Sequence, residues 1–159
     1  MNLEVKPHVE IYTDGACAGN PGPGGWGALL IFNGKRKEIF GYELNTTNNQ
    51  MEMAGAIFAL KALKRPCKVT IYTDSVYLQK GITEWIFNWE KNNWLKSDNK
   101  PVKNVELWQN LRYEIKKHDI IWKWIKGHND NQGNIIADKL AVKGKEKAKK
   151  ICTNTNVVN

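Results

Sequence analysis

The sequence predicts a single α/β domain, residues 1–159, built around a mixed β-sheet. Three observations predict this fold class. The length is that of one domain, the apolar patterns place three strands before alternating helices and strands, and the tetrapeptide Ile-Tyr-Thr-Asp occurs twice, each time ending a strand-like run. Consecutive strands favour an antiparallel meander, whereas strand-helix-strand units favour parallel pairing. We therefore expect a sheet that is antiparallel at one side and parallel at the other, with helices on its faces.

The first part of the chain has the pattern of a three-stranded meander. Residues 9–14 alternate in polarity and run into a loop rich in glycine and proline, residues 19–25. Residues 26–32 are apolar, residues 37–44 alternate, and an Asn-Gly pair between them is a tight-turn signal. These two segments are therefore expected to form a hairpin that follows the first strand.

A helix and a second strand ending in aspartate follow the meander. Asn49 is expected to begin a helix that Pro66 ends, because Glu52 stands three residues after Asn49 as in a capping box. A strand ending at Asp74 comes next, and residues 75–89 have helical periodicity. These elements supply the crossover connections of the parallel half of the sheet.

The last third of the chain is expected to add one strand between two helices. Proline in a first helical turn predicts a helix over residues 101–118, followed by a strand over 120–126 and a final helix from 134 to about 147. The basic and polar residues after it, about 148–159, are expected to form a flexible tail.

The composition narrows the classes of partner and compartment. A formal net charge of +8, from 24 Lys and Arg against 16 Asp and Glu, favours a polyanion such as nucleic acid. A membrane is the weaker alternative, since the apolar stretches are short and no basic amphipathic anchor stands out. The three cysteines are too widely spaced for a disulfide framework or a zinc site. The N-terminus carries no hydrophobic signal segment, so a cytoplasmic location is expected.

Four acidic residues stand where they would converge on one edge of the predicted sheet. Asp14 and Asp74 end the two repeated runs, and in parallel neighbouring strands they would lie within one or two strand spacings of each other. Glu52 and Asp138 each lie one turn into a helix. Each acid alone also has an ordinary interpretation, as a turn former, a cap, part of a capping box or a solvated helix residue. Together they favour a divalent-cation site, because closely spaced carboxylates repel one another and bind hard cations.

Six short motifs occur in the order Thr13-Asp14-Gly15, Gly19-Asn20-Pro21-Gly22, Thr47-Asn48-Asn49-Gln50-Met51-Glu52, Thr73-Asp74-Ser75, Gly127-His128 and Ala137-Asp138. In this order and spacing they resemble ribonuclease H type 1, over about residues 9–142. Residues 81–85 and 100–105 further resemble the bacterial form that carries a basic protrusion. The resemblance implies a ribonuclease H-like fold: a five-stranded mixed sheet, its first three strands an antiparallel meander and the others parallel, flanked by helices.

The resemblance also implies a reaction. The chain would be an endonuclease that hydrolyses the RNA strand of RNA-DNA hybrids without base-sequence specificity, leaving 5′-phosphate and 3′-hydroxyl ends. An acidic quartet would hold two Mg²⁺ ions when substrate is bound, with Mn²⁺ as an alternative ion. Its members would be Asp14, Glu52, Asp74 and Asp138, with Asp14 contacting both ions. His128, in the loop before the last helix, would move protons or help to release the product and its metal.

Several residues would read the hybrid, again by resemblance. Four would lie in the minor groove near the scissile phosphate and the 2′-hydroxyls: Cys17 through its backbone, Asn20, Asn48 and Asn49. The others would bind the DNA strand, through deoxyribose for Tyr77 and Trp85 and through a phosphate for Thr47 and Asn104. Lysines of the protrusion would add backbone contacts: Lys80, Lys91, Lys96, Lys100 and Lys103. Asparagine is equally a turn and cap residue, and Trp85 also fits a core position, so these alternatives stay open.

Two other functions compete with this interpretation. A non-catalytic hybrid-binding protein would not need the acidic quartet, which is intact here. A nuclease of the same fold that cuts DNA would not need the asparagines and the basic protrusion. One departure from the family pattern is Ile135, where glutamate is usual, and the change removes a carboxylate beside the expected metal site. The family also implies a monomer.

Overall fold

A computed structural model describes residues 5–126 and 131–157 of the chain. Five strands form one sheet in the order β3-β2-β1-β4-β5. They are β1 (His8–Cys17), β2 (Gly22–Phe32), β3 (Lys35–Thr46), β4 (Lys68–Thr73) and β5 (Asp119–Trp124). β2 pairs antiparallel with β1 and β3, whereas β4 pairs parallel with β1 and β5. This topology confirms the predicted fold class, an antiparallel meander continued by parallel strands.

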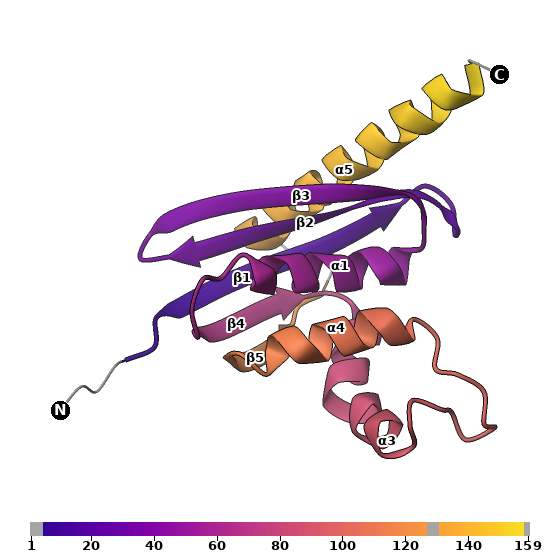
Figure 1. The fold of residues 1–159 in the computed structure, drawn as a ribbon. Helices are drawn as coiled ribbons and strands as arrows, with labels where there is room; N and C mark the ends of the chain where they lie inside the picture. The colour runs from indigo at the N-terminus through magenta and orange to yellow at the C-terminus, as the bar shows by residue number, and fades with distance from the viewer. Residues whose placement is uncertain (1–4, 127–130, 158–159) are drawn as a thin grey trace.

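Helices cover both faces of the sheet. They are α1 (Asn48–Lys61), α2 (Val76–Lys80), the π-helix η1 (Gly81–Trp85), α3 (Ile86–Lys91), α4 (Val105–Ile115) and α5 (Gln132–Val157). Figure 1 shows α1 and α4 side by side in front of the sheet, with α5 behind β2 and β3. α2, η1 and α3 continue one another, as the helical periodicity over residues 75–89 predicts.

The main core lies between the sheet and the α1 and α4 helices. Its fully buried side chains include Ile11 of β1, Ile71 of β4, Met53 and Leu60 of α1, and Trp108 of α4. Burying an aliphatic side chain of this size stabilises the fold by about 1.5–3 kcal/mol. These contacts hold the two central parallel strands and α1 in fixed positions, and the candidate site is built on those three elements.

The two Ile-Tyr-Thr-Asp runs lie side by side in the sheet. Ile11 pairs with Ile71 and Tyr12 pairs with Tyr72 across the parallel β1–β4 ladder. The two tyrosine rings stack with centroids 4.4 Å apart. Because the repeats are in register, the aspartates that end them reach the same edge of the sheet, as the sequence predicts.

Three glycines allow α5 to approach the sheet closely. A Cβ atom on Gly25 of β2 would overlap the α5 backbone at Ala141 and Lys145, and one on Gly27 would meet Ala137 and Leu140. Gly144 of α5 in turn lies against the Gly41 carbonyl of β3. α5 therefore rests directly on backbone, which fixes the position of the acidic residue in its second turn.

The start of α1 differs from the prediction by one residue. The helix begins at Asn48 and its N-cap is Thr47, whose Oγ1 accepts a hydrogen bond of 3.2 Å from the Gln50 amide. The predicted cap at Asn49 is therefore wrong. Threonine and asparagine both cap helices well, and the extended backbone of Thr47 decides between them.

The start of α4 also differs from the prediction. Pro101 pairs with Leu95 in an isolated bridge and lies outside the helix. α4 begins at Val105, after Asn104 has adopted a left-handed backbone conformation with φ of 60°. Proline suits a turn as well as a first helical position, and here it belongs to the turn.

The final helix is longer than predicted. α5 runs from Gln132 to Val157, so its end near residue 147 is wrongly predicted. Neither proline nor glycine follows Gly144, and Ala148 is fully buried. The Cys152 thiol also lies 3.8 Å from the Leu44 carbonyl of β3, to which it donates. The helix therefore keeps packing against β3 after the predicted end, and Figure 1 shows its last turns projecting past the sheet.

We expect Gly25→Ala to lower the free energy of unfolding by about 1–3 kcal/mol, because the added methyl must displace α5. The control is Gly34→Asn in the β2–β3 turn, where a Cβ atom meets no other atom within 4 Å. Asparagine tolerates the positive φ of that position, so a change within about 0.5 kcal/mol is expected. Urea unfolding measures both, and equal losses would contradict the close contact between α5 and β2.

Candidate active site

Three carboxylates from three elements meet at the carboxyl edge of the central strands. Asp14 belongs to β1, Asp74 follows β4 directly, and Glu52 lies one turn into α1. Ligand oxygens of the three side chains all lie within 4.8 Å of one another. Asp14 and Glu52 are buried, at 6% and 4% exposure, and Asp74 is half-buried. The arrangement brings together three of the four acids predicted from the sequence.

Crowding and burial shift the proton affinities of these groups. Burial, and then the charge of Asp74, raises the pKa of Asp14 to about 7, although the Gly15 amide donates a 2.9 Å hydrogen bond to it. Burial and the neighbouring Asp14 raise the pKa of Glu52 well above its ordinary value. Desolvation and like charge act in the same direction on both carboxyls. The cluster therefore holds protons at neutral pH unless a cation replaces them.

The fourth acid lines the same cleft from α5. The cleft has a volume of about 430 Å³, and its lining includes the three clustered carboxylates, Asn48, Asn49, Tyr77 and Asp138. Asp138 is exposed, and its side chain hydrogen-bonds with Asp14 and raises the pKa of that group further. It lies beside the three-carboxylate cluster, at the mouth of the cleft.

The donor set fits a divalent cation. Glu52 Oε2 is buried and has no hydrogen-bond partner among the residues that the structure describes. An unpaired buried carboxylate oxygen is destabilising unless something binds it. All the converging atoms are carboxylate oxygens, which suit Mg²⁺, Mn²⁺ or Ca²⁺ and not the softer metals. These residues could therefore hold such an ion.

Asparagines border the cleft on the side of the β1–β2 loop. Asn20 Oδ1 accepts a hydrogen bond of 3.2 Å from the Asn48 amide, which ties the loop to the start of α1. Asn48 and Asn49 are exposed and line the cleft. The Cys17 thiol instead points into the structure, where it lies 3.3 Å from the Thr46 carbonyl. The structure thus places Cys17, Asn20, Asn48 and Asn49 at one rim.

A chain of hydrogen bonds joins the rim to the aromatic side of the site. Gln50 donates to Asn104 Oδ1 at 3.0 Å, and Asn104 donates to the Tyr77 hydroxyl at 3.1 Å. The Trp108 indole also donates to this hydroxyl, at 3.2 Å. Gln50 in turn accepts from the Thr46 hydroxyl at 2.9 Å. The role of Gln50 could not be predicted from the sequence, since an amide in a first helical turn carries no signal of partners distant in sequence.

Aromatic rings in edge-on and tilted contacts lead from this network into η1 and α3. Trp85 packs edge-on against Tyr77, with ring centroids 5.9 Å apart, and Trp89 lies 5.8 Å from Trp85. Trp85 and Trp89 are both half-buried, whereas Trp108 is the fully buried core residue of this group. The five predicted backbone-contacting lysines are all exposed: Lys80, Lys91, Lys96, Lys100 and Lys103.

The site and fold match one family of known proteins. The family model described as RNase H matches residues 6–146. The chain belongs to the ribonuclease H family. Ribonuclease H of Rickettsia akari (strain Hartford) is 69% identical over 144 residues, covering 91% of this chain and 95% of that protein. Ribonuclease HI of Rickettsia conorii (strain ATCC VR-613 / Malish 7) is 69% identical over 140 residues, covering 88% of this chain and 92% of that protein.

A solved structure supports the same assignment. The crystal structure of LC9-RNase H1, a type 1 RNase H with the type 2 active-site motif, superposes with a TM-score of 0.83 at 30% identity. It covers 92% of this chain and 76% of that one. As a ribonuclease H, the chain belongs among enzymes that cut the RNA strand of RNA-DNA hybrids with divalent metal ions. The acidic cluster gives this chain the groups to bind such ions.

Two further positions matter in a ribonuclease H of this type. His128, predicted to move protons or to help release the product, lies outside the described residues. Ile135, the departure that the sequence analysis noted, is 39% exposed in the first turn of α5. The other histidines have structural contacts, since His8 Nε2 lies 3.1 Å from the Thr70 hydroxyl and His118 Nδ1 accepts from the Cys67 amide.

Within the described residues, none of the helices combines the length and the apolar character that crossing a membrane requires.

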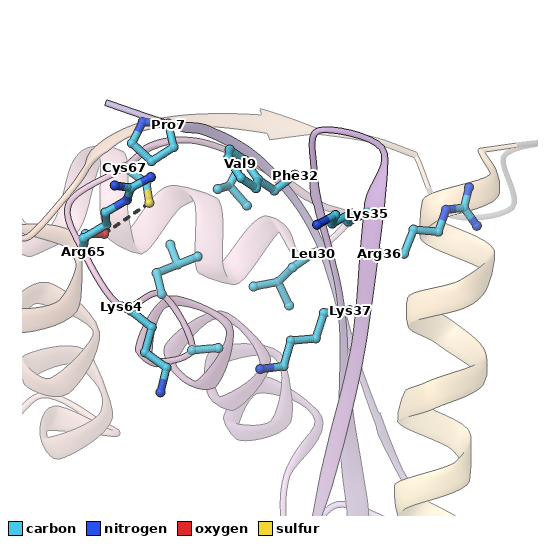
Figure 2. A pocket seen from close by; sticks show the side chains of 12 residues that line it. Pro7, Val9, Leu30, Phe32, Lys35, Arg36, Lys37, Lys64, Arg65 and Cys67 are labelled. Atoms are coloured by element: carbon cyan, nitrogen blue, oxygen red, sulfur yellow. Dashed lines mark hydrogen bonds between the residues drawn. The ribbon is translucent and has the colours of Figure 1, made fainter. Parts of the chain in front are cut away.

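A second pocket lies at the opposite end of the strands. Figure 2 shows side chains that line it: Val9, Leu30 and Phe32 are apolar, and Lys37 and Lys64 are cationic. Its volume is about 300 Å³, and its lining contains no carboxylate. This pocket therefore has no carboxylate for metal-assisted chemistry, which belongs to the acidic cleft at the other edge.

We expect the metal-free protein to lose stability as the pH rises from about 4 to about 7. Folded Asp14, with a pKa of about 7, binds its proton more tightly than the unfolded chain does, so this stabilisation is complete at low pH and is lost through pH 7. Each unit of pKa difference corresponds to about 1.4 kcal/mol. Asp14→Asn removes the titration, and its melting temperature in EDTA should exceed that of the wild type at pH 8 and match it at pH 4.

The control for this measurement is Asp119→Asn. Asp119 is an exposed carboxylate 2.9 Å from Lys6, and this hydrogen bond lowers its pKa. Its replacement should give no gain in melting temperature at pH 8. The interpretation of the cluster is wrong if Asp14→Asn and the wild type melt together at every pH.

Proposed function

We propose that this chain is an endonuclease that hydrolyses the RNA strand of RNA-DNA hybrids with two Mg²⁺ ions. The observation that carries the proposal is the cluster of buried carboxylates within 4.8 Å of one another, in a cleft bordered by asparagines. Membership of the ribonuclease H family supports the reaction and the class of substrate. The residues proposed to hold the ions are Asp14, Glu52, Asp74 and Asp138.

The proposed mechanism divides the work between buried and exposed acids. When bound in the acidic cluster, divalent ions would supply the positive charge that favours deprotonation of the attacking water and offsets charge on the departing 3′ oxygen. Asp14 hydrogen-bonds with both Glu52 and Asp138 and therefore sits where it can face both ions. Asp138 is exposed at the cleft mouth, so water can take its place as a ligand when product leaves. We assign the accompanying proton transfer to His128, since an imidazole side chain can both donate and accept a proton.

The rim of the cleft supports recognition of the hybrid. Asparagine both donates and accepts hydrogen bonds, so Asn20, Asn48 and Asn49 suit the 2′-hydroxyls and base edges of the minor groove. Cys17 would contribute its backbone there. These groups would select the RNA strand for cutting, since a DNA strand in the same place offers no 2′-hydroxyl.

The aromatic side of the cleft supports binding of the DNA strand. The Tyr77 and Trp85 rings would pack on deoxyribose, which lacks the polar 2′ group. Thr47 and Asn104 would bind a DNA phosphate, and Gln50 holds the Asn104 side chain in place through its 3.0 Å hydrogen bond. One chain contributes every group of this proposed site, so we propose that it acts as a monomer, in the cytoplasm.

The decisive assay compares three labelled duplexes: an RNA-DNA hybrid, duplex DNA and duplex RNA, each with Mg²⁺. We expect cutting of the RNA strand of the hybrid alone, with 5′-phosphate ends. Asp14→Asn should lower the rate by about 10²-fold or more, because several kcal/mol of metal-based charge stabilisation is lost. Asp119→Asn is the control and should keep full activity. Hybrid binding without cleavage by the wild type would favour a non-catalytic protein, and cleavage of duplex DNA a DNA nuclease.

A second experiment tests the position of Ile135 beside the metal site. Ile135→Glu adds a carboxylate three residues before Asp138, and we expect it to lower the Mg²⁺ concentration needed for half-maximal activity. A partly exposed charge contributes up to about 1 kcal/mol, so a shift of about twofold to fivefold is expected. Ile135→Gln is the uncharged control and should leave the Mg²⁺ requirement unchanged. The same Mg²⁺ requirement in both variants would place residue 135 outside the field of the ions.

A further inference from the structure

The second half of α5 passes beside the rim of the candidate active site. The Lys145 backbone lies directly against Gly25 of β2. Gly25 pairs with Ala16, and the neighbouring Gly24 pairs with Cys17, the last residue of β1. The charge of Lys145 also reaches the Cys17 thiol, where it opposes the rise in pKa that burial causes. α5 therefore passes next to Cys17, one of the residues proposed to read the RNA strand.

The lysines of α5 divide between two sides of the helix. At about 100° per residue, Lys145 and Lys149 fall within about 20° of Asp138, so they share the cleft side with it. Lys143 and Lys147 lie on the other side, over the Phe40 ring of β3, with their Nζ atoms 4.9 and 5.8 Å from its centroid. The two pairs have equal charge and spacing but face different parts of the molecule.

We propose that Lys145 and Lys149 contact backbone phosphates of the hybrid outside the cleft, so that α5 extends the nucleic-acid interface. This inference rests on the proposed function. At about 1.5 Å per residue, the two lysines lie about 10 and 16 Å along the helix from Asp138. They therefore meet the flank of the substrate, several nucleotides from the bond that is cut.

The charge of this segment fits a phosphate backbone. Between residues 139 and 150, α5 carries six lysines and a single acid, Glu146. Glu146 lies 3.6 Å from Lys149, but both side chains are about half exposed. An exposed ion pair of this kind is weak, so a phosphate can replace Glu146 as the partner of Lys149. Lysine acts on phosphate as a point charge, and the contact would add affinity without base preference.

The test compares two double variants with the same loss of charge, Lys145→Ala with Lys149→Ala and Lys143→Ala with Lys147→Ala. Both are made in the Asp14→Asn background, and hybrid affinity is measured between about 50 and 200 mM salt. Loss of two phosphate contacts should reduce the slope of log affinity against log salt by up to about 2 and weaken binding about threefold to tenfold at low salt. Lys143→Ala with Lys147→Ala should leave both the salt slope and the affinity at low salt unchanged. Alanine keeps the helix, which circular dichroism verifies.

Substrate length locates the contact. At about 3.4 Å per base pair, a flank of about 2 base pairs falls short of both lysines and a flank of about 8 base pairs passes them. Each flank is extended in turn on either side of one cleavable position. Replacing Lys145 and Lys149 should weaken binding only of the hybrid that has the long flank on one particular side. With Asp14 intact, the same two substitutions should raise the KM for that substrate and leave kcat unchanged.

Three outcomes would overturn the inference: equal effects of the two pairs, no effect of either pair, or an effect that is independent of flank length. Equal effects would show that only net charge matters. These outcomes differ from failure of the proposed function, in which the wild type would not cut even the short-flanked hybrid.

Discussion

The candidate active site depends on carboxylates that the fold holds close together against their mutual repulsion. Asp14, Glu52 and Asp74 bring their oxygens within 4.8 Å, and two of the three side chains are buried. Burial and mutual charge raise the proton affinity of Asp14 and Glu52, so the folded chain binds protons or cations there more strongly than the unfolded chain does. A cluster that destabilises the ionised, metal-free fold is thereby a strong ligand for a divalent ion.

Such crowding persists only because the backbone prevents the acids from separating. The β1–β4 ladder holds Asp14 and Asp74 at one sheet edge, and the Thr47 cap begins the helix that carries Glu52. The glycine contacts of β2 hold α5, and with it Asp138, against the same edge. Three independent packing arrangements thus support one site. A fold that relaxed at any of them would relieve the repulsion and lose affinity for the ion.

The sequence analysis succeeded where a local pattern decides the structure. The register of the two repeats follows from matching alternation, so the meeting of Asp14 and Asp74 could be predicted. Prediction failed where two local solutions are equally good: Pro101 suits a turn and a helix start alike. The hydrogen bond from the Val102 amide to the Trp94 carbonyl and the Leu95–Pro101 bridge decide in favour of the turn. It also missed Gln50, because its partners come from β3 and α4 and the chain gives no periodic sign of them.

The error at the end of α5 has a different cause, since a lysine-rich run looks solvated whether or not it is helical. Ala148 and Cys152 continue the packed side of the helix after Gly144. One continuous helix therefore carries both Asp138 and the later lysines. A helix resting on glycine backbone has little freedom to shift, so Lys145 and Lys149 keep a fixed distance from the carboxylates. Their charge can then hold a flank of the hybrid without moving the metal ligands, which separates substrate affinity from the chemistry of the cut.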